Sequence, residues 1–89
     1  MSLGPVGQRL TQKLTDAFSP MELEVIDESH KHAGHVGARP EGETHFRVEI
    51  VADAFDGKSL VQRHRMVNQT LAEELADRVH ALSISAKGP

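Results

Sequence analysis

Three histidines, His30, His32 and His35, stand within six residues of a chain that contains no cysteine. Histidine is the side chain that most readily binds a transition metal or changes its charge near neutral pH. A fourth histidine, His80, lies far away in the sequence, at the expected start of a strand. If the fold brings His80 to this segment, two imidazoles form half of a metal site that a partner would complete.

The composition is that of one small globular domain. The chain has 89 residues, of which 38% are hydrophobic and 26% charged, and this length predicts a single domain over 1–89 with flexible ends at 1–4 and 86–89. The absence of cysteine excludes a disulfide framework and any thiolate ligand from this chain. We find no leader-like segment and no run long enough to span a membrane, so we expect a cytoplasmic protein without membrane contact.

The formal net charge of −3 argues against avid, sequence-independent binding of nucleic acid, because that binding requires lysine and arginine to neutralise phosphates. A local basic patch is still present in the sequence. Lys58, Arg63 and Arg65 lie close together, with no acidic residue between Gly57 and Gln69.

Hydrophobic periodicity predicts two helices and three strands. A polar stretch from about residue 28 to residue 44 separates the first two strands, and loops of that length are often functional. Ser59 and Gln62 resemble a capping box at the start of the second helix. In chain order the expected elements are helix 5–18, strand 21–25, strand 45–50, helix 59–76 and strand 79–84.

These elements predict an α+β fold of the order α-β-β-α-β. The first two strands form an antiparallel pair, and the helix between the second and third strands favours a parallel, right-handed crossover. The expected architecture is a three-stranded mixed sheet with both helices packed on one face.

Five sequence strings, in this order and spacing, resemble the BolA family: ESHKHAGH, ETHFRVEIV, FDGK, RHRMVNQTLAEEL and VHALSI. Together they cover residues from about 22 to 85. The resemblance implies an α-β-β-α-β domain similar to the class II KH fold, in agreement with the elements that the periodicity predicts.

The resemblance also implies a function that periodicity alone does not. BolA-like proteins pair with monothiol glutaredoxins, and each pair holds a bridging 2Fe–2S cluster used in iron–sulfur trafficking or iron regulation. By this resemblance the metal ligands of this chain are His80 in VHAL and His32 in the loop, and His35 or His30 could replace His32. The sulfur ligands would come from the glutaredoxin and from glutathione, so no cluster is expected on the isolated chain.

Other interpretations of these residues remain open. Some BolA members are reported to bind promoters and to influence stress responses and cell morphology, so a DNA-binding regulator is the alternative, with contacts from Gly57, Lys58, Arg63 and Arg65. The full GXXG loop of KH domains is absent. Self-association into a weak homodimer through a sheet edge is also open. We expect no enzyme, because no nucleophile or phosphate-binding motif is present.

The histidines have simpler interpretations as well. The loop histidines could belong to a mobile polar loop, whereas a closed structural zinc site is less expected from three histidines in one loop. His64 lies on the apolar stripe of the second helix, which favours a core histidine whose ring nitrogen bonds a backbone group. His45 should face away from the core, so solvent exposure or a minor interface role is favoured over metal binding.

Overall fold

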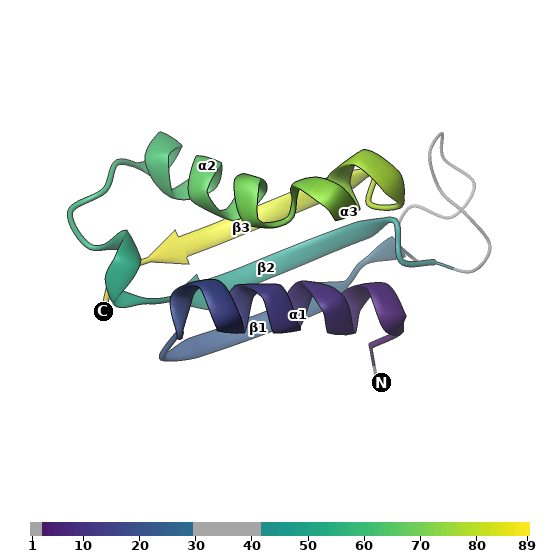
Figure 1. Ribbon diagram of the computed structural model, residues 1–89, viewed down its shortest axis with the longest axis horizontal. Helices are drawn as coiled ribbons and strands as arrows, with labels where there is room; N and C mark the ends of the chain where they lie inside the picture. The colour runs from purple at the N-terminus through teal and green to yellow at the C-terminus, as the bar shows by residue number, and fades with distance from the viewer. Residues whose placement is uncertain (1–2, 30–41) are drawn as a thin grey trace.

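The computed structural model of this chain describes residues 3–29 and 42–89. Figure 1 shows two helical segments lying along one side of a twisted sheet. No helix within these two ranges combines the length and the apolar character needed to cross a bilayer. In chain order the elements are α1 (Pro5–Phe18), β1 (Glu22–Asp27), β2 (His45–Val51), the short 3-10 helix η2 (Asp53–Phe55), α2 (Leu60–Thr70), α3 (Ala72–Asp77) and β3 (Ala81–Lys87).

The three strands form a mixed sheet in the order β1-β2-β3, so β2 is central. β1 pairs with β2 in antiparallel orientation. β2 pairs with β3 in parallel orientation, and His45 lies opposite Ala81 in that register. The predicted mixed sheet and its α-β-β-α-β order are confirmed.

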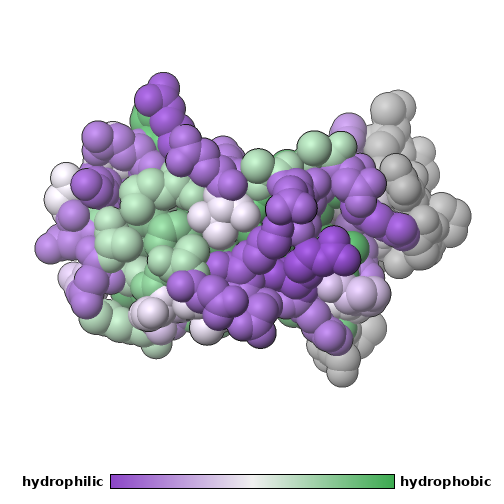
Figure 2. All heavy atoms as spheres, in the orientation of Figure 1, coloured by the Kyte–Doolittle hydropathy of each residue, from purple (hydrophilic) through white to green (hydrophobic). Residues whose placement is uncertain are grey.

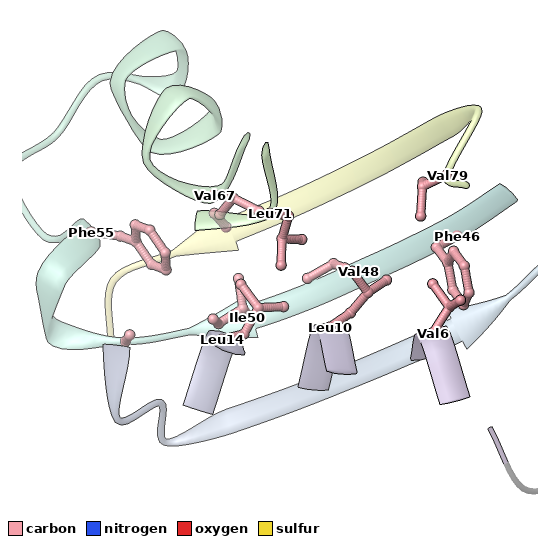
Figure 3. Packing of buried hydrophobic residues seen from close by; sticks show 12 residues of the cluster. Val6, Leu10, Leu14, Phe46, Val48, Ile50, Phe55, Val67, Leu71 and Val79 are labelled. Carbon is pink, nitrogen blue, oxygen red and sulfur yellow. The ribbon is translucent and has the colours of Figure 1, made fainter. Parts of the chain in front are cut away.

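The hydrophobic core lies between the sheet and the helices, on one face of the sheet (Figure 3). In β2, Phe46, Val48 and Ile50 are buried, whereas Arg47 and Glu49 between them are exposed. This alternation is the period-two pattern of a strand with one covered face. The main helical residues that pack against β2 are Val6, Leu10 and Leu14 of α1 and Val67 and Leu71 of α2.

The second helical region is not the single helix 59–76 that the periodicity predicts. It begins as expected, because Ser59 and Gln62 form a complete capping box. It is then divided at Leu71, whose ψ of 19° is not helical. Just before this break the Thr70 hydroxyl donates a hydrogen bond of 2.9 Å to the Met66 carbonyl, a back-bond that commonly bends helices.

The C-terminal end is more ordered than the sequence suggests. β3 extends to Lys87 rather than ending near residue 84, and Ala86 is buried in the core. The Ala52 amide donates to the Lys87 carbonyl at 3.0 Å. The expectation of a flexible end is therefore wrong for residues 86 and 87, because their backbone belongs to the sheet.

An ion pair joins α3 to α1 across a hydrophilic area of the surface (Figure 2). The Glu74 side chain is only 2% exposed, and its carboxylate lies 2.9 Å from the Lys13 ammonium group. The carboxylate of Glu73 contacts the same ammonium group at 3.4 Å. The hydrogen bond to Glu74 is the main reason that the pKa of Lys13 is raised above its ordinary 10.5, although burial opposes the shift.

The raised pKa of Lys13 predicts a stability loss in alkaline solution. A cation whose pKa is higher in the folded state stabilises fully below pH 10.5, and this contribution disappears as the pH rises through the folded value. We expect the urea midpoint to stay nearly constant from about pH 8 to about pH 10 and to fall as the pH rises above about 10.5, and this fall should be smaller in Lys13→Met. No tyrosine or cysteine titrates in this range. Equal falls in both proteins would contradict the prediction.

Candidate metal-binding site

The two ends of the segment that carries His30, His32 and His35 are tied together at one end of the sheet. The Asp27 carboxylate accepts a hydrogen bond from the Ser29 amide at 2.9 Å and another from the Glu43 amide at 3.2 Å. The Ser29 hydroxyl oxygen accepts from the amides of Thr44 at 2.9 Å and His45 at 3.2 Å. Side chains from the end of β1 and just beyond it thus hold the residues that lead into β2.

Glu43 connects the hydrogen-bond network of Asp27 and Ser29 to the start of α1. Gly4, the residue before α1, has no side chain that could cap the helix. The carboxylate of Glu43, which is distant in the sequence, caps the helix instead. It accepts hydrogen bonds from the amides of Val6 at 2.6 Å and Gly7 at 3.0 Å. A carboxylate at a helix N-terminus satisfies unpaired amides and interacts favourably with the helix dipole. Glu43 adopts a φ of +60°, a region that side chains with a Cβ rarely occupy.

Replacing Glu43 should destabilise the domain through this cap. We expect Glu43→Ala to lower the free energy of unfolding by about 1–2 kcal/mol, because the alanine keeps the unfavourable φ and loses both hydrogen bonds. Glu43→Gly should cost less, since glycine adopts a positive φ without strain. Urea titrations of the three proteins would measure the difference. Equal losses in both variants would show that backbone conformation at this position contributes nothing.

His80 lies at this same end of the sheet, immediately before β3. Its backbone amide donates to the Thr44 carbonyl at 2.7 Å, and the Ala81 amide donates to the same oxygen at 3.1 Å. The His80 side chain is exposed, whereas the preceding Val79 is buried in the core. The backbone of His80 is therefore fixed while its imidazole remains accessible to a partner.

The structure places a second imidazole beside His80, and it is not one of the metal ligands that the sequence predicts. The ring centroids of His45 and His80 are 5.3 Å apart, with the planes tilted by 55°. His45 is only 7% exposed, so the expectation of solvent exposure is wrong. Its Nδ1 lies 2.8 Å from the Thr44 hydroxyl oxygen, which orients the ring.

A signal for this pair is present in the sequence. In a parallel β-α-β unit the first residues of the two strands lie side by side. His45 begins β2, and His80 directly precedes Ala81, its partner in the register. The sequence thus indicates two strands that each start at or next to a histidine, and the register of the folded sheet makes these two histidines neighbours.

The loop candidates His30, His32 and His35 lie outside the described residues. Within residues 3–29 and 42–89 there is no group of three or more histidine, cysteine, aspartate or glutamate side chains that could hold a metal ion. The described part of this site therefore consists of two neighbouring imidazoles, from His45 and His80, at the base of the loop.

His64 belongs to α2 and is not part of this pair. It is half-buried, as expected for the apolar stripe. Its Nε2 is buried without a hydrogen-bond partner, so this ring nitrogen does not make the expected bond to a backbone group. A ligand role for His64 has no structural support.

The basic residues proposed to contact a partner or nucleic acid differ in whether their side chains already make hydrogen bonds within the domain. The Arg63 guanidinium donates to the carbonyls of Lys58 at 3.0 Å and Ala86 at 3.1 Å, and so ties α2 to β3. Lys58 and Arg65 are exposed. Gly57 occupies the turn before α2 with a φ of +75°, which explains why glycine suits this position.

An apolar surface adjoins these basic residues. Leu60 and Val61, in the first turn of α2, are 64% and 58% exposed. Figure 2 shows a further apolar area over the end of the molecule where α1 ends and α2 begins. This part of the domain combines exposed aliphatic side chains with the positive charges of Lys58 and Arg65.

Comparisons with known proteins agree on one family. A family model described as BolA-like protein matches residues 14–89. A BolA-like protein 1 from Mus musculus is 50% identical over 86 residues, which are 97% of this chain and 60% of that protein. The DNA-binding transcriptional regulator BolA of Escherichia coli is 46% identical over 79 residues, which are 89% of this chain and 71% of the regulator.

Solved structures support the same relationship. The BolA domain of SufE1 from Arabidopsis thaliana matches with a TM-score of 0.90 and 52% identity, covering 99% of this chain and 96% of that domain. The whole SufE-like protein 1, named as chloroplastic/mitochondrial, is 50% identical over 93 residues, but this chain spans only 25% of its length. The compartment in that name differs from the cytoplasmic location expected from the sequence.

Proposed function

This chain belongs to the BolA-like family, and from that membership we propose that it docks on a monothiol glutaredoxin and co-ligates a bridging 2Fe–2S cluster. His80 is the proposed ligand from the described part of the chain. His32 is the proposed loop ligand, with His35 and His30 as alternates. The role is that of an adaptor in iron–sulfur trafficking or iron regulation.

The exposed imidazole of His80 beside the base of the histidine loop is the observation that carries this proposal. Both ends of the loop are anchored within the hydrogen-bond network of Asp27, Ser29 and Thr44. The Thr44 carbonyl also accepts from the His80 amide. The loop therefore starts and finishes next to the proposed ligand, and an accessible side chain at this corner suits a site completed by a second protein.

The donor chemistry fits a shared cluster. The chain has no cysteine, so the thiolates must come from the glutaredoxin and glutathione. Imidazole ligands in place of two thiolates occur in Rieske centres, where they raise the reduction potential. In this chain the residues supply neutral nitrogen donors, and the fixed backbone at His80 limits the positions that its ring can take.

Reconstitution tests the adaptor function directly. The chain is mixed with a monothiol glutaredoxin, glutathione, iron and sulfide without oxygen, and the mixture is separated by size-exclusion chromatography. We expect a brown 1:1 complex, whereas the chain treated alone should remain colourless. Separate elution of the two proteins, with the cluster only on a glutaredoxin dimer, would overturn the proposal.

A DNA-binding function is the second candidate, favoured by the name of the E. coli relative. The exposed positions available for it are Lys58, just before α2, and Arg65 within α2. Arg63 is a weaker candidate, because its guanidinium already bonds two carbonyls. Exposed aliphatic side chains at Leu60 and Val61 beside the basic residues offer no hydrogen bonds to phosphate.

Salt dependence separates this function from the adaptor function. If Lys58 and Arg65 contact phosphates, replacing both with glutamine should weaken duplex binding by the protein alone and reduce the salt slope by about 2. Fluorescence anisotropy of a labelled duplex at several salt concentrations measures both quantities. Arg47→Gln, on the opposite face of the sheet, is the matched control. Unchanged binding in the double variant would exclude this surface.

A further inference from the structure

We infer that the outer edge of β3 is a self-association surface, on which two copies of this chain pair their β3 strands in antiparallel orientation. The sheet of one copy continues into the sheet of the other across a twofold axis that passes between the two Ser83 residues. This pairing uses backbone groups of β3 and needs neither glutaredoxin nor a metal ion, so it is independent of the proposed function.

The backbone of β3 alternates between the β2 side and the free side of the strand. β3 lies at one edge of the sheet, because the strand order is β1-β2-β3. In a parallel pair the amide and the carbonyl of one residue point to the same side, and successive residues alternate. The Ala81 amide donates to the Thr44 carbonyl, so Ala81 and every second residue after it face β2. Leu82, Ile84 and Ala86 therefore direct their backbone groups toward the outer edge.

Arg63 confirms this direction and closes one end of the edge. Its guanidinium, on α2, donates to the Ala86 carbonyl at 3.1 Å, so that carbonyl points away from β2 and is already occupied. In the described part of the chain, nothing pairs with the outward backbone groups of Leu82 and Ile84. Each residue offers one donor and one acceptor, and an unpaired strand edge of this kind is a template for another chain.

The side chains of β3 favour a second copy as the partner. From Ala81 to Ala86 the strand carries no charged residue, and Ser83, on the uncovered face of the sheet, is exposed. The opposite edge differs, because Glu22 and Glu24 of β1 are exposed and a twofold axis there brings like charges together. Charged residues on edge strands prevent self-pairing. Self-association through β3 meets no such repulsion.

The free backbone groups also determine the register. A twofold axis between the two Ser83 residues sets Leu82 of each copy opposite Ile84 of the other. Residues directly opposite in an antiparallel pair exchange both hydrogen bonds when their backbone groups face each other, and in this register every free group of Leu82 and Ile84 finds a partner. A register centred on Ile84 would need the Ala86 carbonyl, which Arg63 occupies.

Sedimentation equilibrium of the full chain over a wide range of concentration tests the inference. We expect a reversible monomer–dimer equilibrium without glutaredoxin or metal. Ser83→Lys puts two positive charges opposite each other and should weaken the dimer at least about tenfold. Ala17→Lys adds the same charge at an exposed position of α1 and should leave the equilibrium unchanged. A chain that stays monomeric at all concentrations, or equal effects of the two variants, would overturn the inference.

Single-cysteine variants test the register, because the chain itself contains no cysteine. Residues that face each other without exchanging hydrogen bonds in an antiparallel pair have Cα atoms about 4.5 Å apart, within the range of a disulfide. Ser83→Cys should therefore form a disulfide-linked dimer in air, whereas Ser85→Cys alone should not. An equimolar mixture of Ser85→Cys and Ala81→Cys should cross-link. Glu24→Cys, at the other edge, is the control.

Cross-linking of Ser83→Cys no faster than that of Glu24→Cys would contradict pairing through β3. Cross-linking of Ser85→Cys alone, at the rate of Ser83→Cys, would contradict the proposed register. Reconstitution of the cluster with glutaredoxin is a separate measurement on the unsubstituted chain, so failure of the self-association and failure of the adaptor function are distinguishable.

Discussion

Replacing His80 with alanine should remove most of the visible absorption of the reconstituted complex with glutaredoxin. His80 is the one proposed cluster ligand within the described residues, and its loss leaves an iron coordination position open to solvent. The loss of one metal ligand should weaken cluster retention by at least about tenfold, on the scale seen even for outer-shell substitutions. The measurement is visible absorption and iron content after size-exclusion chromatography of the 1:1 complex.

The position of His80 makes this result interpretable. Its side chain is exposed, and the hydrogen bond to the Thr44 carbonyl comes from its backbone amide, which alanine retains. We therefore expect the free energy of unfolding to change by no more than about 0.5 kcal/mol. His64→Ala is the matched control, because it removes an imidazole from α2. Full retention of the cluster by His80→Ala would remove this residue from the ligand set.

Replacing Leu14 with alanine should destabilise the domain far more than the same substitution at Leu60. Leu14 is fully buried against β2, whereas Leu60 is 64% exposed. Removing a buried leucine side chain costs about 2–5 kcal/mol, through lost transfer energy and the cavity left behind. The exposed position should change the free energy of unfolding by about 0.5 kcal/mol or less.

The two variants carry the same leucine-to-alanine substitution, one at a buried position and the other at an exposed position. Native domains have a total stability of about 5–15 kcal/mol, so Leu14→Ala alone could remove a large part of it in a domain of this size. Urea unfolding followed by circular dichroism measures both variants. Similar losses at the two positions would mean that Leu60 is covered in solution, for example by a second copy of the chain.

The same packing explains how core stability and the site are connected. Phe46 follows His45 in β2 and is 2% exposed, and Val79 precedes His80 and is 3% exposed. Each of these two histidines is thus adjacent in sequence to a core residue, and both core residues, Phe46 and Val79, are labelled in Figure 3. A core substitution near this end of the sheet should consequently change the positions of His45 and His80 as well as the stability of the domain.

The sequence predicted the fold well where local patterns and the core agree. The alternation of Phe46, Val48 and Ile50 predicted a strand with one buried face, and burial confirms it. The Ser59 and Gln62 pattern predicted a capping box, and both hydrogen bonds are formed. These features depend on residues within one element, so their signals are present in the linear order.

The sequence did not predict the features that depend on contacts between residues far apart in the chain. The cap of α1 comes from Glu43, 37 residues after the Val6 amide that it accepts from. The burial of Ala86 in the core likewise depends on packing between elements. No local pattern carries this information, because the partners meet only after the chain has folded.

The residue types alone determined which chemistry is available to this protein: six histidines and no cysteine allow nitrogen ligation and exclude a thiolate ligand from this chain. The tertiary structure alone decided which imidazoles meet. Parallel pairing of β2 with β3 brings His45 to within 5.3 Å of His80, although the whole of α2 and α3 lies between them in the chain. The physical reason is that side-chain chemistry is local to each residue, whereas a binding site depends on distances that only the pairing of strands sets.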